Sequence, residues 1–319
     1  MTIKNFIRNK NILRNCAKLV NRMFQFFILM FIKYRIIKKV GLSTYKCARN
    51  KKIVSFPNEL SHSVKILDSG YALEKVLLAC GIKSRQYNPW VSATIIINWQ
   101  DITDDLLDTN NYVSRSYEYT SRKLIRSINI KCTDISKKKI ASIHKEAFGY
   151  DLDVNPLLYN GLAVKKSDSN ATHDGVVIKC PLTSVDNDFV YNKLICNENG
   201  TQAIDYRVIY MNGVVDLFYE KRRNLNDRFS NTNNLTILRK IKDEFSEDEI
   251  EKIEKFGFLM AADYGEFDVL RDKDSKKIYI VDFAKTPFGP PNGLSIKDRL
   301  KSIEHMSVHF IKEVLIPLK

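Results

Sequence analysis

The sequence predicts an α+β fold, in which a basic helical arm and a small α/β unit precede a larger unit of antiparallel sheets. Three observations predict it. Residues 1–58 carry fourteen Lys or Arg, no Asp or Glu, and a continuous apolar run. Residues 59–130 alternate helical and strand-like patterns. Residues 131–319 contain strand-like runs joined by short polar turns, which indicate β-hairpins.

The N-terminal arm, residues 1–58, accounts for the whole net charge of the chain. That charge is +14, from 51 Lys and Arg against 37 Asp and Glu. Because fourteen of the bases lie in the arm, the remaining residues hold 37 bases and 37 acids. A protein that binds nucleic acid through its main domain concentrates positive charge there, so the pattern disfavours nucleic acid as a partner.

The apolar run of the arm, residues 23–32, is too short to cross a bilayer, which takes roughly 20 apolar residues. Lys33, Tyr34 and Arg35 follow it where a signal peptide would have small residues. Two interpretations stay open. The run lies on an anionic membrane surface, or it packs onto the body of the protein. The six cysteines include no C-x-x-C pair, which predicts a reducing cytoplasm, with the inner membrane face as an alternative location.

The elements that follow the arm are predicted from local patterns. Residues 70–80 form a helix that ends at Gly81, residues 92–99 form a strand buried on both faces, and residues 114–125 form a second helix. A helix over residues 133–150 is capped by Asp134 or Ser136 and ends at Gly149. No Gly-rich nucleotide fingerprint occurs in the α/β unit.

Residues 160–181 are predicted to form two strands joined by a polar loop. Lys165 and Lys166 end the first strand, and the loop runs from Ser167 to residue 175 with Asn170 and His173 inside it. Its Ser, Asn, Thr and Asp residues favour tight turns whose N–H groups can bind an anion. A structural role for His173 is the alternative to a functional one.

The next region is predicted to contain strands at residues 188–196, 203–210 and 214–222. Asn212–Gly213 is a hairpin signal between the last two. Residues 223–245 are polar and Asn-rich, which predicts a loop or lid. A capping box at Ser246 opens a helix that runs to about residue 261, and Ser295 caps a final amphipathic helix.

Residues 262–293 are predicted to form a hairpin of two strands, 266–271 and 277–284. Asp282 lies in the apolar run of the second strand, and Asp268 and Glu266 lie on the first. A carboxylate in a buried strand needs an ion pair or a bound cation. Oxygen ligands on neighbouring strands suit Mg²⁺, whereas a salt-bridged hairpin with an acidic edge is the alternative.

The hairpin residues D-V-L-R-D, I-Y-I-V-D and T-P-x-G resemble the C-terminal metal-binding strands of the ATP-grasp superfamily. The resemblance implies ATP between two antiparallel sheets, with Mg²⁺ on Asp268, Asp282 and, as a further candidate, Glu266. One departure is Ala284, which stands where the family usually has a metal-binding Asn.

Further motifs resemble the family in its usual order, beginning with an acid–Lys helix start at residues 134–137. The strand lysines and polar loop resemble its phosphate loop. The D-x-R-V strand then supplies Asp205 and Arg207, followed by a basic strand end. The resemblance implies that the strand lysines, the polar loop and the D-x-R-V strand bind ATP, with catalysis by Lys221 and Arg222, because the transferred phosphoryl group needs its charge neutralised. The implied nucleotide ligands are Lys165, Lys166, Ser167, Asn170, His173, Asp205 and Arg207.

The implied activity is that of a ligase that depends on ATP and Mg²⁺. Such an enzyme phosphorylates a carboxylate and lets an amine or another nucleophile displace the phosphate. The chain also resembles uncharacterised ATP-grasp proteins of cell-envelope polysaccharide biosynthesis, which fits an arm at a membrane surface. Two alternatives are an inactive nucleotide-binding relative, for which Ala284 is the evidence, and a membrane-surface binding module.

Overall fold

The computed structural model describes residues 3–316 except 59, 62–64, 87–92, 101–102, 105–125, 170–171, 173 and 229–232, and it leaves out the side chains of residues 3–13 and 57. The helix predicted at residues 114–125 and two predicted site residues, Asn170 and His173, lie outside the described residues.

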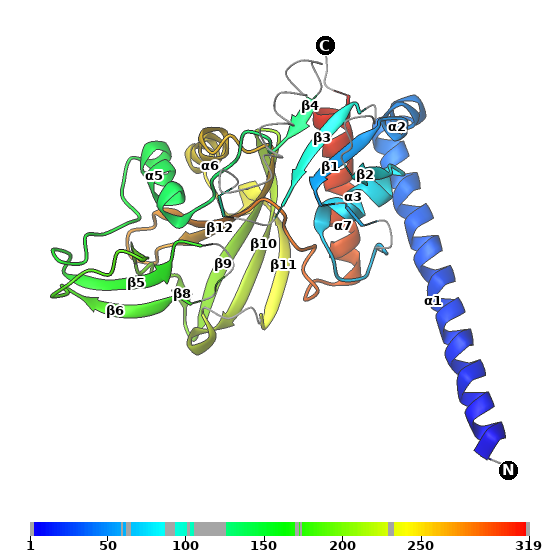
Figure 1. Ribbon diagram of the computed structural model, residues 1–319, viewed down its shortest axis with the longest axis horizontal. Coiled ribbons are helices and arrows are strands. Elements are labelled where there is room, and N and C mark those ends of the chain that lie inside the picture. Colours follow the sequence, from blue (N-terminus) through cyan, green and yellow to red (C-terminus); the bar gives the residue numbers. More distant parts are fainter. Residues whose placement is uncertain are drawn as a thin grey trace.

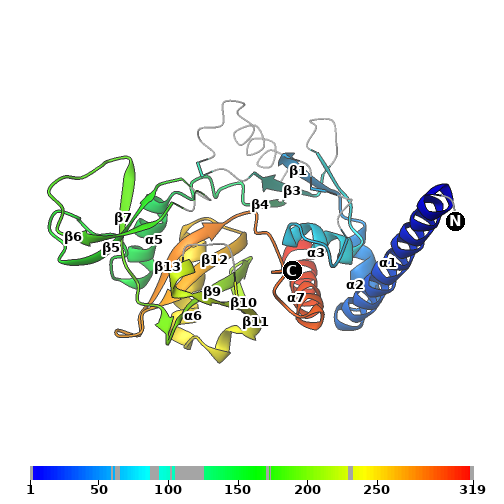
Figure 2. The same ribbon diagram turned by 90° about the horizontal axis from the view of Figure 1, so that it is seen from below.

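Three sheets and several helices make up the described structure (Figures 1 and 2). The α-helices are α1 (Ile3–Val40), α2 (Leu42–Arg49), α3 (Ala72–Cys80), α5 (Lys137–Phe148), α6 (Glu247–Leu259) and α7 (Ile296–His309). The strands are β1 (Ile53–Pro57), β2 (Ser84–Gln86), β3 (Ile95–Trp99), β4 (Arg126–Ile128), β5 (Gly161–Ser167), β6 (Val176–Cys180), β7 (Phe189–Lys193), β8 (Glu198–Asn199), β9 (Gln202–Met211), β10 (Val214–Asn224), β11 (Leu235–Lys240), β12 (Tyr264–Arg271) and β13 (Ile278–Ala284).

The N-terminal unit is a parallel sheet in the order β2-β1-β3-β4, packed against α3 and α7. Its first strand, β1, falls inside the range predicted for the arm, so the arm is helical only as far as Arg49. The last helix, α7, packs on α3 and α1 although it lies far from them in the sequence (Figure 1). The two ends of the chain therefore build one core.

Helix α1 contacts this core through its C-terminal half and extends beyond the body through its N-terminal half (Figure 1). Ile32 and Ile36 are buried, and Arg35 and Lys39 each pair with Glu304 of α7 at 2.8 Å. Of the apolar run 23–32 itself, Ile32 is buried while its Phe and Met side chains are about half exposed, so neither of the two predicted interpretations is settled for the run. None of the described helices combines the length and the apolar character needed to cross a membrane.

The large sheet is antiparallel, in the order β11-β10-β9-β12-β13, with β8 paired to β9. The Asn212–Gly213 turn joins β9 to β10, with positive φ angles of 49° and 87° as a tight hairpin turn requires. Strand β11 was not predicted: residues 223–245 were interpreted as a loop or lid. The run Leu235–Lys240 nevertheless pairs along β10, because its Leu, Thr and Ile residues suit an edge strand.

The small sheet has the order β6-β5-β7 and stands beside the large one (Figure 2). Both of its strand pairs are antiparallel, so the predicted α+β class with two antiparallel sheets is confirmed. The predicted caps are also confirmed, because Ser136, Ser246 and Ser295 each accept a hydrogen bond from the first turn of their helix. Helices α5 and α6 pack against each other on the large sheet, where α5 contacts β13 and α6 contacts β10.

Candidate functional site

A pocket of about 270 Å³ lies between the small sheet and the large sheet. Strands β5, β7, β9, β10, β12 and β13 line it, together with the first residue of α5. Its walls carry more positive than negative side chains. The bases are Lys137, Lys166, Lys193, Arg207, Lys221, Arg223 and Arg228, and the acids are Asp174, Asp205, Asp268 and Asp282.

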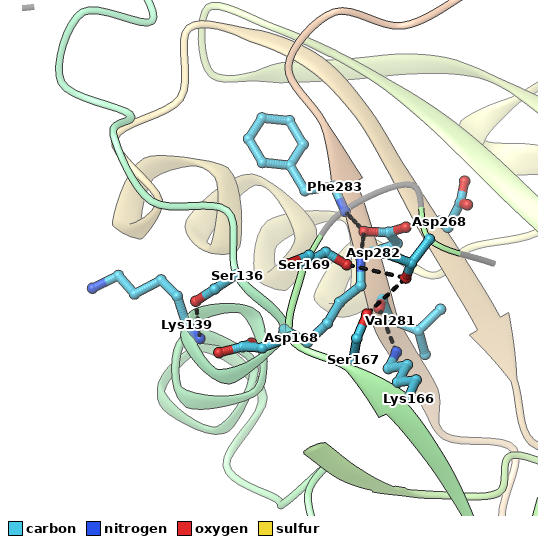
Figure 3. Close-up of polar contacts among 12 residues, drawn as sticks. Ser136, Lys139, Lys166, Ser167, Asp168, Ser169, Asp268, Val281, Asp282 and Phe283 are labelled. Atoms are coloured by element: carbon cyan, nitrogen blue, oxygen red, sulfur yellow. Dashed lines mark hydrogen bonds and ion pairs between the residues drawn. The ribbon is translucent and has the colours of Figure 1, made fainter. Parts of the chain in front are cut away.

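The two lysines at the end of β5 face opposite sides of the small sheet, as neighbours on a strand do. Lys166 lines the pocket, and its Nζ donates a 3.3 Å hydrogen bond to the carbonyl oxygen of Val281 on β13 (Figure 3). Lys165 instead pairs with Asp186 at 3.1 Å and lies over the ring of Phe189. Of the two predicted phosphate ligands, only Lys166 is in the pocket wall.

The bases at the end of β10 also face opposite sides of their sheet. Lys221 and Arg223 line the pocket, whereas Arg222, a predicted catalytic residue, pairs with Glu220 at 2.5 Å and is absent from the wall. The Lys221 side chain is only 9% exposed and has no hydrogen bond or ion pair with any other described residue. A buried ammonium group that faces a pocket without a partner is a candidate ligand for an anion.

The predicted metal acid Asp268 is held by Arg207 from the neighbouring strand β9. Two parallel hydrogen bonds join them, from Nε to Oδ1 at 2.7 Å and from Nη2 to Oδ2 at 2.9 Å. Glu266 lies behind this pair, 3.7 Å from Arg207, and is 2% exposed. It is absent from the pocket wall. Burial raises the pKa of Glu266 to about 7, although the Arg207 and Lys221 charges oppose the rise.

Asp282 lies opposite Asp268 in the strand register and also pairs with a base of this chain. Its Oδ1 accepts hydrogen bonds from Lys137 Nζ at 2.5 Å and from the Phe283 backbone N–H at 2.9 Å (Figure 3). The expectation that Asp282 is buried is wrong: its side chain is 34% exposed because it faces the pocket.

The acids in the pocket can contribute to a magnesium site only together with a further ligand. No group of three or more metal-binding side chains occurs among the residues that the structure describes. Asp268 and Asp282 face each other across β12 and β13, but both are paired with bases. Two carboxylates fit Mg²⁺ that arrives with phosphate oxygens, since this ion usually keeps few protein ligands. Ala284 offers no side-chain oxygen to complete the set.

The polar loop after β5 is closed by its own side chains where it leaves the strand. Asp174 accepts from the Ser167 N–H at 3.2 Å, and the Ser167 and Thr172 hydroxyls lie 2.8 Å apart. Asp168 accepts a hydrogen bond from the Lys138 N–H in the first turn of α5 at 2.9 Å. Ser167 lines the pocket, but its N–H is already bound and does not act as the predicted free donor.

Asp205, a predicted nucleotide ligand, lines the pocket and positions a base. It pairs with Arg223 at 2.5 Å and accepts from Asn197 at 2.8 Å. The wall also has an apolar part, formed by Val164, Leu194, Ile195, Leu270 and Val281. Asn192 adjoins it with a 3% exposed side chain whose amide atoms have no hydrogen-bond partner among the described residues. An apolar wall with an unsatisfied amide suits a flat polar ring.

Several pocket residues were missed by the sequence reasoning, namely Lys137, Asn192, Lys193, Arg223, Arg228 and Asn233. Strand alternation was the available signal for Arg223, because a strand that presents Lys221 on one face presents residue 223 on the same face. Lys137 was noticed only as part of a helix start. No local signal marks Asn192 or Arg228, because their places depend on how the two sheets meet.

The pocket lysines predict a pH-dependent affinity for phosphate ligands. Burial lowers the pKa of both Lys166 and Lys221 to about 8, with the Arg207 charge as the second cause for Lys221. A bound anion favours the charged lysine, so binding above pH 8 takes up protons and affinity falls as pH rises further. Calorimetric titration in buffers of different ionisation enthalpy measures the uptake. Equal affinity and no uptake above pH 8 would contradict this prediction.

The fold and the site together define a protein with a pocket, lined by more bases than acids, between two antiparallel sheets, which is the arrangement that the ATP-grasp resemblance predicted. No family model matches the chain, and no curated protein matches it.

Solved structures that are similar to the chain include ATP-grasp ligases. PsnB, complexed with precursor peptide PsnA2 and AMPPNP, has a TM-score of 0.48 and 10% identity over 82% of this chain and 98% of its own. The macrocyclase MdnC from Microcystis aeruginosa MRC, bound with precursor peptide MdnA, has a TM-score of 0.43 and 11% identity over 84% and 99%. The Chryseobacterium gregarium RiPP-associated ATP-grasp ligase, in complex with ADP and a leader and core peptide, has a TM-score of 0.46. It is 12% identical over 83% of this chain and 96% of its own.

Proposed function

We propose that this chain is a ligase that uses Mg·ATP, with the nucleotide bound in the pocket between the two sheets. The observation that carries the proposal is Lys221: a buried base with no partner among the described residues, which faces the pocket beside Arg207. Lys166 faces the same space from the opposite sheet. Bases that converge from two sheets on one pocket suit a polyphosphate, because its several charges need neutralising at once.

The two parts of the pocket wall match the two parts of ATP. The apolar part, with the unsatisfied amide of Asn192, would hold the base, and the basic part would hold the phosphates. Asp268 and Asp282 would bind Mg²⁺ together with phosphate oxygens. The ion would supply charge neutralisation for the triphosphate. Lys166, Arg207 and Lys221 would then orient the terminal phosphoryl group and stabilise the charge that develops on it.

In the proposed reaction a carboxylate oxygen of the acceptor attacks the γ-phosphorus and ADP leaves. An amine or another nucleophile then attacks the acyl carbon, and phosphate leaves. The finer part of the proposal is the acceptor: a carboxylate of a cell-envelope glycan precursor, which rests on the sequence resemblance alone. Incubating the protein with Mg·ATP and panels of uronic acids or peptides, and measuring ADP formation, tests it. ADP formation with the peptides but not with the uronic acids would contradict a glycan precursor as the acceptor.

Mg·ATP is expected to stabilise the folded protein. A ligand at about 100 times its dissociation constant adds roughly 2.7 kcal/mol to the free energy of unfolding. Asp282→Asn should abolish most of this gain. It should cost only about 1–2 kcal/mol without ligand, because Asn still accepts a hydrogen bond from Lys137. Thermal unfolding with and without Mg·ATP measures both effects. A variant that melts much lower alone, yet gains as much from Mg·ATP as the unmodified protein, would exclude the metal site.

A second candidate function is nucleotide binding without catalysis. Its evidence is that both metal acids are paired with bases of this chain and that Ala284 offers no third ligand. Binding of Mg·ATP without ADP formation for any acceptor, while both acids are intact, would favour this candidate over the ligase.

A further inference from the structure

Helix α1 has two apolar faces, and only one of them is covered. The covered face contains Ile32 and Ile36, which pack into the core with α3 and α7. Met23 and Phe27 lie nine residues before these two, which is about two and a half helical turns and therefore the opposite side of the helix. Met23 is 52% exposed and Phe27 is 62% exposed. Figures 1 and 2 show α1 at the outer edge of the molecule.

The uncovered residues form a continuous stripe on this outward face. They recur at intervals of three or four residues, which keeps them on one side of a helix. The stripe consists of Leu19, Val20, Met23, Phe27, Met30 and Tyr34, all at least about half exposed, and Phe24, Phe26 and Phe31 on the same segment are about half exposed as well. Because the body of the protein is attached on the other side, a large flat partner can reach the stripe without displacing the core.

The charge around the stripe selects the class of partner. Arg14, Lys18 and Arg22 lie on the polar side of the same helical segment, all exposed, and make no ion pair with the residues that the structure describes. Residues 1–58 contain no Asp or Glu. A second copy of α1 on this face would offer no acidic partner for these bases, and the net positive charges of the two helices would repel each other. An anionic surface offers the complementary charge.

We infer that the outward face of α1 binds the surface of an anionic phospholipid bilayer, with the helix lying in the plane of the membrane. The apolar stripe enters the boundary between headgroups and acyl chains. A helix is about 10–12 Å across, so the bases on its polar side stay near a Debye length from the headgroups, and their long side chains can extend towards them. The pocket between the two sheets would then work close to the membrane surface.

Flotation of the full-length protein with vesicles tests this inference. We expect binding to vesicles of phosphatidylglycerol and phosphatidylcholine, and much weaker binding to phosphatidylcholine alone. Replacing Arg14, Lys18 and Arg22 with Gln should weaken binding to the anionic vesicles on the order of 100-fold, which is about fivefold for each base at about 1 kcal/mol. The double variant Met23→Ser, Phe27→Ser should weaken it by roughly tenfold or more for each side chain.

The matched control is Phe258→Ser, which removes another exposed ring, 77% exposed on α6, from a different surface. This control should bind vesicles as the unmodified protein does. The variants change only exposed side chains, so their melting curves should be unchanged. Deleting the arm would be a poorer test, because it removes the buried Ile32 and Ile36.

Two results would overturn the inference. One is equal vesicle binding by the double variant and the control. The other is a dimer of the unmodified protein in sedimentation that the double variant abolishes, together with vesicle binding that the variants leave unchanged; this would assign the face to a second copy. Neither outcome depends on whether the pocket binds Mg·ATP.

Discussion

Lys166→Met is expected to weaken Mg·ATP binding by about 10- to 100-fold, because it removes a charge-assisted hydrogen bond worth about 1.5–3 kcal/mol. The side chain lines the pocket, and methionine keeps its length without the charge. The folded protein should tolerate the change, since burial already disfavours the charged lysine and lowers its pKa to about 8. Calorimetric titration with an ATP analogue and Mg²⁺ gives the affinity.

The neighbouring residue provides the matched control. Lys165→Met removes an identical charge one position away, on the face that pairs with Asp186. It should leave the affinity for Mg·ATP within about twofold, and stability within about 1 kcal/mol, because the pair is exposed. Equal losses of affinity in the two variants would mean that the overall charge matters rather than the pocket, and the assignment of Lys166 would fail.

Arg207→Met is expected to lower the free energy of unfolding by about 3 kcal/mol near neutral pH. The variant leaves Asp268 without its two hydrogen bonds and Glu266 without its nearest base, so two largely buried carboxylates lose their counter-charge. Denaturant unfolding of the apo protein measures this cost. The variant should also lose Mg·ATP binding, but the stability difference is measurable without any ligand.

The same cost should shrink as the pH falls below 7. Burial raises the pKa of Glu266 to about 7 in the folded protein, whereas the Arg207 charge and hydrogen bonds help to hold the pKa of Asp268 below its usual value. Losing Arg207 therefore raises the pKa of both carboxyl groups. A group whose pKa is higher in the folded than in the unfolded protein stabilises the fold at low pH, and this stabilisation is lost as the pH rises through the folded-state pKa. Lowering the pH should therefore narrow the difference in the free energy of unfolding between the Arg207→Met variant and the unmodified protein.

Arg222→Met is the matched control for Arg207→Met, because it removes the same charge from the same sheet at a position outside the pocket wall. Glu220 keeps a second partner in Arg239, so this change should cost about 1 kcal/mol or less. An Arg207→Met variant as stable as Arg222→Met at neutral pH would show that the buried acids do not need Arg207.

Much of the fold could be predicted because its signals are local. The capping serines, the Asn212–Gly213 turn and the two strands around Asp268 and Asp282 are each specified within a few residues. The regular register of the hairpin would instead pair Asp268 with Val281. An irregularity between Asp268 and Val269 shifts the pairing by one residue and places Asp282 opposite Asp268, and no local pattern predicted it. Strand β11 was missed because the polar, Asn-rich composition of residues 223–245 concealed a short apolar run that pairs only when β10 is beside it.

The sequence by itself determined which segments become strands and helices, and which charged residues stand at their ends. Only the tertiary structure decided which of two adjacent bases faces the pocket, as at Lys165 and Lys166, since one step along a strand reverses the side. It also decided that Arg207 and Lys137 neutralise the two candidate metal acids, from 61 and 145 residues away in the chain. Ion pairs of this kind carry no local pattern, because they form only where separate sheets and helices meet.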